Sequence, residues 1–152
     1  MGRGHEPGEV HELTGDGVLA LPVRLHGIEL GRPADLLLDR EALRVVGYDV
    51  VCGDEVHRFL PFPTAAIGDG ELTIHSPLVL LEEDQLAFYR SRSFSLASLR
   101  GRAVTEKRRD VGALRDVVFA RDGSLLAVTL DGGARVPFDD ALAFVPRARS
   151  AA

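Results

Sequence analysis

The feature that most constrains the fold is a phrase that occurs twice within 152 residues. The segment PADLLLDREALRVVGY at 33–48 is similar to RDVVFARDGSLLAVTL at 115–130. The matched residues are Leu25 and Gly27 with Leu99 and Gly101, 74 positions apart; Gly31 and Asp35 with Gly112 and Asp116, 81 apart; and Pro61-Phe62 with Pro137-Phe138, 76 apart. The unequal separations predict a seven-residue insertion before Gly112 and a later deletion, both at loops, where length changes are tolerated best. We interpret the matched order as an internal duplication.

The duplication divides the chain into five parts. They are a flexible N-terminal lead-in at 1–20, a first repeat at 21–76, a connector at 77–98, a second repeat at 99–146 and a tail at 147–152. The lead-in is glycine-rich and acidic without apolar periodicity. Each repeat contains short apolar, β-branched runs separated by Gly, Asp and Pro, a pattern typical of antiparallel strands joined by turns.

The connector is the part that predicts helix. Residues 83–90 begin with acidic side chains and end with a basic one, which suits the dipole of a short helix. Residues 95–99 predict one more helical turn, and 78–81 predict a strand. The predicted class is therefore mainly β, with two small β units and a short connecting helix. One larger barrel or sandwich that shares strands between the halves is the alternative.

Composition bounds the class of protein. At 45% hydrophobic residues the chain has enough apolar material for a core. The N-terminal segment lacks the apolar core of a signal peptide, and no window reaches about 18 continuous apolar residues, so a cytoplasmic location without membrane insertion is expected. Cys52 is the single cysteine, which excludes an intrachain disulfide and a CxxC site and predicts a buried strand cysteine.

The repeated motifs resemble those of a known family. At LHGIELGRPADLLLD, followed by a hairpin and LPFP, and again at LRG, VGALRDVVFARDG and VPFDD, the chain is similar to PRC-barrel domains. These are small β-barrel modules of the H subunit of purple-bacterial photosynthetic reaction centres, of a ribosomal-RNA maturation factor and of many other prokaryotic proteins. The likeness covers Val23 to about Ile74 and Leu99 to Val145. It implies two compact β units and a role in docking or assembly.

No pattern predicts catalysis, a cofactor or a metal site. Asp35 and Asp116 occupy matching positions and would be the carboxylates of a hydrolase-like site, which is the rival hypothesis. The interpretation that we favour is that each caps a turn or hydrogen-bonds the entrance of a strand. The histidines, His5, His11, His26, His57 and His75, lack the spacing of metal ligands, and no serine lies in a nucleophile-elbow motif. We therefore predict a non-enzymatic binding or scaffold protein.

A basic segment, RGRAVTEKRRDVGALR, is the candidate partner-binding surface. Its basic residues are Arg100, Arg102, Lys107, Arg108, Arg109 and Arg115. Arginine forks bind carboxylates or phosphates in bidentate fashion, so an acidic protein surface is one partner class. An RNA- or ribosome-associated factor that binds through residues 100–115 is the alternative function, and a plain solvated loop is the alternative without function. The net charge of −5 and the lack of tryptophan weigh against nucleic acid.

Charge is distributed unevenly along the chain. Residues 1–76 carry 6 basic and 13 acidic side chains, whereas residues 77–152 carry 12 and 10. Such complementary surfaces favour contact between halves or between copies, and short β units leave edges that a copy can cover. A homodimer is therefore expected.

Overall fold

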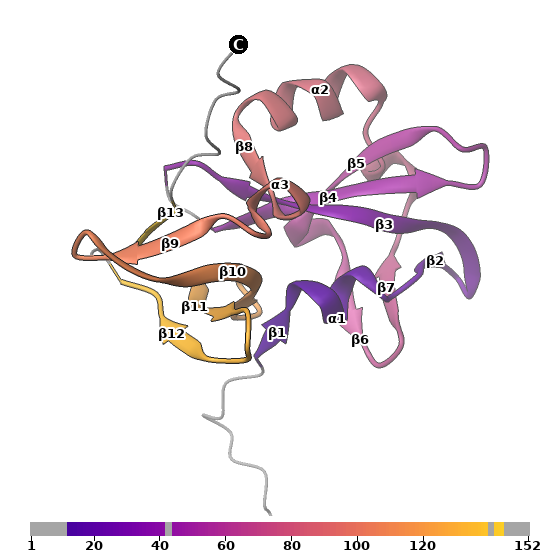
Figure 1. The fold of residues 1–152 in the computed structure, drawn as a ribbon. Helices are drawn as coiled ribbons and strands as arrows, with labels where there is room; N and C mark the ends of the chain where they lie inside the picture. The colour runs from indigo at the N-terminus through magenta and orange to yellow at the C-terminus, as the bar shows by residue number, and fades with distance from the viewer. Residues whose placement is uncertain (1–11, 42–43, 140–141, 145–152) are drawn as a thin grey trace, which may run out of the picture.

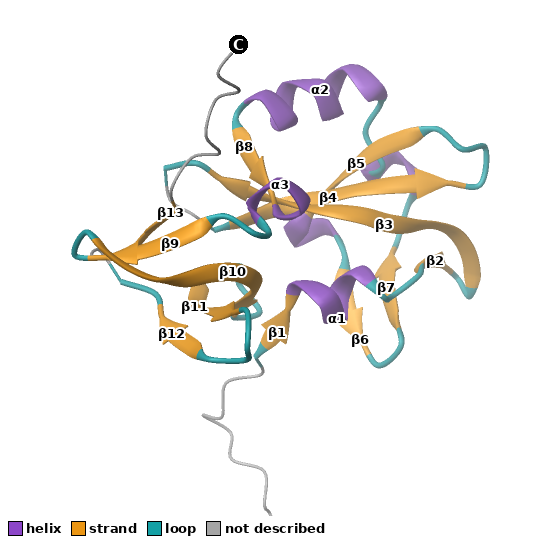
Figure 2. Ribbon diagram, in the orientation of Figure 1, coloured by secondary structure: helices purple, strands orange, loops and turns teal. Residues whose placement is uncertain are grey.

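The computed structural model describes residues 12–41, 44–139 and 142–144, and it confirms a mainly β chain. Two sheets of mostly antiparallel strands lie side by side, with short helices against them (Figures 1 and 2). Each sheet is built mostly from one half of the sequence, as the duplication predicts. The predicted tail at 147–152 lies outside the described residues.

The first sheet is formed mainly by the first repeat. Its strands are β2 (Val23–Leu25), β3 (Ile28–Asp39), β4 (Val45–Cys52), β5 (His57–Pro61), β6 (Ala66–Gly68) and β7 (Glu71–Ile74), in the order β5-β4-β3-β2-β7-β6. The long strands are rich in valine and leucine, residues that fit a pleated, half-buried surface. β4 is buried along most of its length because side chains pack on both of its faces.

The second sheet is formed mainly by the second repeat. Its strands are β9 (Ala103–Glu106), β10 (Arg109–Phe119), β11 (Leu125–Leu130), β12 (Arg135–Pro137) and β13 (Leu142–Phe144), in the order β12-β11-β10-β9-β13. β10 corresponds to β3 and β11 to β4. The two similar phrases of the sequence are therefore the two central hairpins of the fold.

The helices are short. They are α1 (Gly15–Leu19), α2 (Glu83–Ser91), α3 (Leu96–Leu99) and the 3-10 helices η1 (Phe62–Thr64) and η2 (Pro77–Val79). α2 confirms the helix predicted at 83–90, and α3 confirms the helical turn predicted at 95–99. The strand predicted at 78–81 is wrong: Pro77 fits the first position of a helical turn, and η2 forms there. Only Leu81 pairs as a strand residue would, through an isolated bridge to Phe59.

Each sheet takes one further strand from the segment that precedes the other unit. β1 (Leu13–Thr14) pairs with β10, Leu13 facing Phe119. β8 (Ser93–Ser95) pairs with β3, Phe94 facing Leu38. Phe94 lies 81 positions after Leu13, and Phe119 lies 81 after Leu38. Each half thus gives a short strand to the sheet of the other half, and the two exchanged strands occupy equivalent places. The halves share these strands while each keeps its own central sheet.

This symmetry corrects two predictions. Residues 13–19 do not belong to a flexible lead-in, because they form β1 and α1 and cover the second sheet; residues 1–11 lie outside the described part of the chain. The hairpin turn His26-Gly27 between β2 and β3 corresponds to Lys107-Arg108 between β9 and β10, again 81 apart. The match of Leu25 and Gly27 with Leu99 and Gly101 is therefore wrong, and so is the seven-residue insertion.

One apolar core joins the units. It contains Val23, Leu36 and Tyr48 from the first sheet together with Leu114 and Phe119 from the second, all nearly inaccessible to solvent. Phe62 bridges them, its ring centroid 5.9 Å from both the Tyr48 and the Phe119 rings. Because burial of apolar area dominates folding free energy, neither unit keeps its full core without the other.

Tyr48 carries an unfavourable group within this core. Its side chain is fully buried, and its hydroxyl finds no hydrogen-bond partner among the described residues. Burial raises the pKa of Tyr48 above its ordinary value near 10. A buried hydroxyl without a partner costs about 1–3 kcal/mol.

Tyr48→Phe is therefore expected to raise the free energy of unfolding by about 1 kcal/mol at neutral pH. Above pH 10 the unfolded tyrosine ionises while the folded one stays protonated, so wild type loses stability as pH rises and the variant keeps it. The gap between the two should widen from pH 9 to pH 11 in urea titrations. Tyr89→Phe is the control. A Tyr48→Phe chain less stable than wild type at both pH values would contradict the assignment.

Candidate functional site

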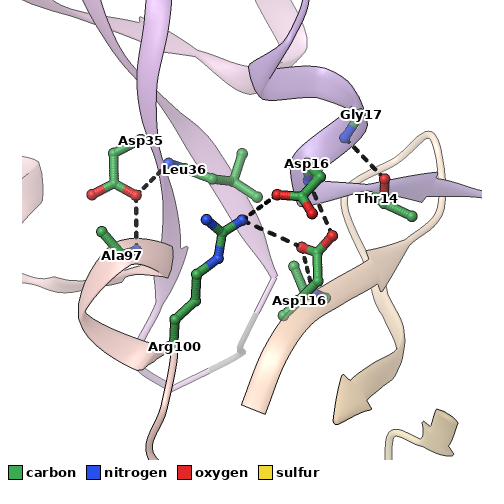
Figure 3. Close-up of polar contacts among 9 residues, drawn as sticks. Thr14, Asp16, Gly17, Asp35, Leu36, Ala97, Arg100 and Asp116 are labelled. Carbon is green, nitrogen blue, oxygen red and sulfur yellow. Dashed lines mark hydrogen bonds and ion pairs between the residues drawn. The ribbon is translucent and has the colours of Figure 1, made fainter. Parts of the chain in front are cut away.

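Asp35 and Asp116 hold the two exchanged helices in place. The Asp16 amide at the start of α1 donates to Asp116 Oδ2 at 3.1 Å, and the Ala97 amide at the start of α3 donates to Asp35 Oδ1 at 3.1 Å (Figure 3). Each carboxylate also accepts from the amide of the residue that follows it, at 2.7 and 2.8 Å. The interpretation of these aspartates as structural hydrogen-bond acceptors is confirmed, and each serves a separate helix.

The same pattern extends to the helix caps. The Thr14 hydroxyl accepts from the Gly17 amide, and the Ser95 hydroxyl accepts from the Ser98 amide. Gly15 lets α1 approach closely, because a Cβ there would come within 2.4 Å of Asp116 Oδ1 and of a Leu96 methyl. The carboxylates of Asp35 and Asp116, which the sequence offers for a hydrolase-like site, thus accept hydrogen bonds that join the two units.

Three of the six predicted partner-binding residues are engaged or distant from the others. Arg100, at the end of α3, pairs with Asp16 at 2.6 Å and lies 4.0 Å from Asp116. Arg102 donates to the Ser98 carbonyl at 2.8 Å. Arg115 is exposed in the middle of β10. The structure therefore does not bring the basic segment together as one loop.

The other three, Lys107, Arg108 and Arg109, form the basic tip: the turn of the β9–β10 hairpin and the first residue of β10. All three side chains are exposed, and none makes a hydrogen bond or ion pair with another described residue. The hairpin projects away from α3 at one end of the molecule (Figure 1). The basic tip is the part of the predicted surface that remains free to bind.

The backbone of this tip is strained. Lys107 and Arg108 have φ of 52° and 69°, in the left-handed region. Tight hairpins favour such angles because their twist matches that of the strands, but they normally use Asn, Asp or Gly. The equivalent turn has His26 and Gly27, with φ of 51° and 81°. An arginine thus stands where the other repeat has glycine, and a non-glycine residue there costs about 1–2 kcal/mol.

Another polar cluster, around Asp49, was not predicted from the sequence. Asp49 on β4 is 2% exposed, and its carboxylate accepts from His57 on β5, Nδ1 to Oδ1 at 2.7 Å, and pairs with Arg90 on α2. The Phe59 and Tyr89 rings stack beside it with centroids 4.2 Å apart. A single buried aspartate within an apolar strand was the available signal. Because Arg90 lies on α2 and Asp49 on β4, the cluster attaches α2 to the sheet.

Within the described residues, no three His, Cys, Asp or Glu side chains gather closely enough to hold a metal ion. His5 and His11 lie outside those residues. Among the described helices, none has the length and apolar character needed to cross a membrane. Cys52 is free and buried at the end of β4, as predicted.

Neither a protein-family model nor a curated protein matches the chain.

Proposed function

We propose that this chain is a non-enzymatic docking protein of the PRC-barrel type, and that its basic tip binds acidic protein surfaces. The aspartates that would serve a hydrolase instead accept backbone hydrogen bonds at the starts of α1 and α3. Lys107, Arg108 and Arg109 are exposed, and their side chains make no hydrogen bond or ion pair with another described residue.

The observation that carries the proposal is the strained arginine. The Arg108 side chain makes no hydrogen bond, ion pair or ring contact with another described residue that would offset its left-handed backbone, and glycine is accommodated at the same place in the first repeat. Residues held in unfavourable conformations cluster at sites of binding and catalysis. An arginine kept at a cost in stability fits a role outside the folded chain.

The chemistry of the tip favours a carboxylate-rich protein over nucleic acid. Two guanidinium groups and one ammonium group present bidentate and point-charge donors on a rigid hairpin. The described residues at the tip include no aromatic side chain on which a base could stack, and the chain carries a net charge of −5. RNA is the second partner class. The two classes differ in what the chain captures and in how steeply salt releases it.

Arg108→Gly tests the trade between stability and binding. Relief of the left-handed strain should raise the free energy of unfolding by up to about 1 kcal/mol, after allowance for the flexibility of glycine in the unfolded chain. Loss of the guanidinium should weaken capture of protein partners from an extract of the producing cells by about tenfold, the scale of an arginine anchor at an interface. Urea unfolding and quantitative pull-down measure the two effects.

The matched control is Gly27→Arg, which places the same side chain in the equivalent turn of the first repeat, where a Cβ meets no atom within 4 Å. It should lower stability and leave capture unchanged. An Arg108→Gly chain that captures proteins as well as wild type would refute docking through the basic tip. Capture of mainly RNA, released steeply by salt, would replace the protein proposal with the nucleic-acid one.

A further inference from the structure

A groove opens at the end of the first unit, between the β4–β5 turn and the start of α2. Its volume is about 1030 Å³. Apolar side chains of Leu30, Cys52, Leu80 and Leu81 line it, and Leu78 stands beside them with 84% of its surface exposed. Exposed apolar patches that are rimmed by polar side chains mark binding surfaces.

The rim of the groove is acidic. Glu29, Asp54, Glu82 and Asp84 line it, against Arg58 as the one basic lining residue. Asp54 is paired with Arg58, and Glu29 is paired with Arg32. Glu82 and Asp84 have no basic partner among the described residues, and both are exposed at the start of α2. The groove thus offers unpaired carboxylates around an apolar floor.

The basic tip complements this groove in charge and in side-chain chemistry. Arginine and lysine place aliphatic stems on apolar surface while their charged ends reach carboxylates, so they suit a floor of leucines with an acidic rim. The β4–β5 turn, whose residues line the groove, and the β9–β10 turn lie at opposite ends of the molecule (Figure 1), so a chain does not reach its own groove. The complementary hairpin must come from another molecule.

We propose that the groove receives the basic tip of a second copy of this chain. The inference rests on the proposed function, since it names the acidic surface that the tip binds. Two copies placed antiparallel bring each tip to the other's groove. Such a reciprocal contact has twofold symmetry and closes at two chains. In it, Lys107, Arg108 and Arg109 face Glu82 and Asp84, and their stems cover Leu78.

Charge exchange tests the contact directly. Light scattering should give the mass of two chains for wild type at micromolar concentration, rather than the 16.4 kDa of one. Glu82→Lys with Asp84→Lys, and separately Arg108→Glu with Arg109→Glu, should each give single chains. Mixed in equal amounts, the two double variants should recover the two-chain mass, because each groove then meets a tip of opposite charge.

Glu83→Lys is the matched control, since it changes the same acidic turn but does not line the groove; it should remain two chains. A one-chain mass for wild type, a mass that grows beyond two chains with concentration, or a mixture that stays at one chain would each overturn the inference. If wild type is a single chain but Arg108→Gly still weakens capture of other proteins, the docking function stands and the self-recognition fails. If two chains form and both double variants keep them, the contact between copies does not use the tip and the groove, and the inference fails.

Discussion

Removal of residues 1–20 is expected to unfold the second unit or to cost about 4 kcal/mol or more of stability. The deletion removes β1 from its pairing with β10 and takes Val18, 1% exposed, out of the core. Burial of a valine side chain contributes about 1.5–3 kcal/mol. The deletion also leaves the buried Asp116 carboxylate without its hydrogen bond from the Asp16 amide, which adds about 1–3 kcal/mol to the loss of stability.

The comparison that isolates this effect is a deletion that ends at residue 11. It leaves every described contact of β1 and α1 in place, so its melting curve should match that of the full chain. Thermal unfolding followed by circular dichroism measures both. A chain beginning at residue 21 that melts within two degrees or so of the full chain would show that the exchanged segment is dispensable.

Much of the fold could be predicted because its signals are local. Valine- and leucine-rich runs separated by turn residues predicted the central hairpins, and the charge order of 83–90 predicted α2. The equivalence of Asp35 and Asp116 was found because each precedes a run of at least three apolar residues. Their favoured role as acceptors followed from the ordinary chemistry of aspartate at turns, and the structure bears it out.

The exchange of segments could not be predicted from the same signals. β1 and α1 together span seven residues, too few to display a period, and Gly15 and Gly17 make the segment resemble a loop. The register error had a similar cause: a Leu-x-Gly match is common by chance, whereas the correct partner of Gly27 is an arginine in the same backbone conformation. The 81-residue separation of Gly31 and Asp35 from Gly112 and Asp116 places Gly27 opposite Arg108, and the shared dihedral angles confirm that equivalence.

The candidate site was predicted in part. Clustering of basic residues in the sequence located the basic tip, but it also included Arg100 and Arg102, which bind within the chain. The acidic groove was not predicted, because its lining residues come from four separate segments of the chain. Sequence proximity is a poor guide to a surface that β3, the β4–β5 turn, η2 and α2 build together.

The central claim is that the basic tip docks onto carboxylates of a protein, and the chain provides an unusually direct probe of it. Lys107 is its single lysine. A carbodiimide joins an amine to a carboxylate in direct contact, so a bond through a lysine side chain of this protein reports on the tip alone. Lys107→Arg keeps the charge but removes the amine, and it should therefore keep binding and lose the bond.

The decisive measurement is carbodiimide coupling in an extract of the producing cells, with peptides mapped by mass spectrometry. The account predicts peptides in which Lys107 is joined to an aspartate or glutamate of another chain, and their loss in Lys107→Arg. Glu82 and Asp84 of a second copy are the expected carboxylates where the self-recognition holds. Products that are the same for wild type and Lys107→Arg, or a wild-type chain that forms no bond through Lys107, would contradict docking through the basic tip.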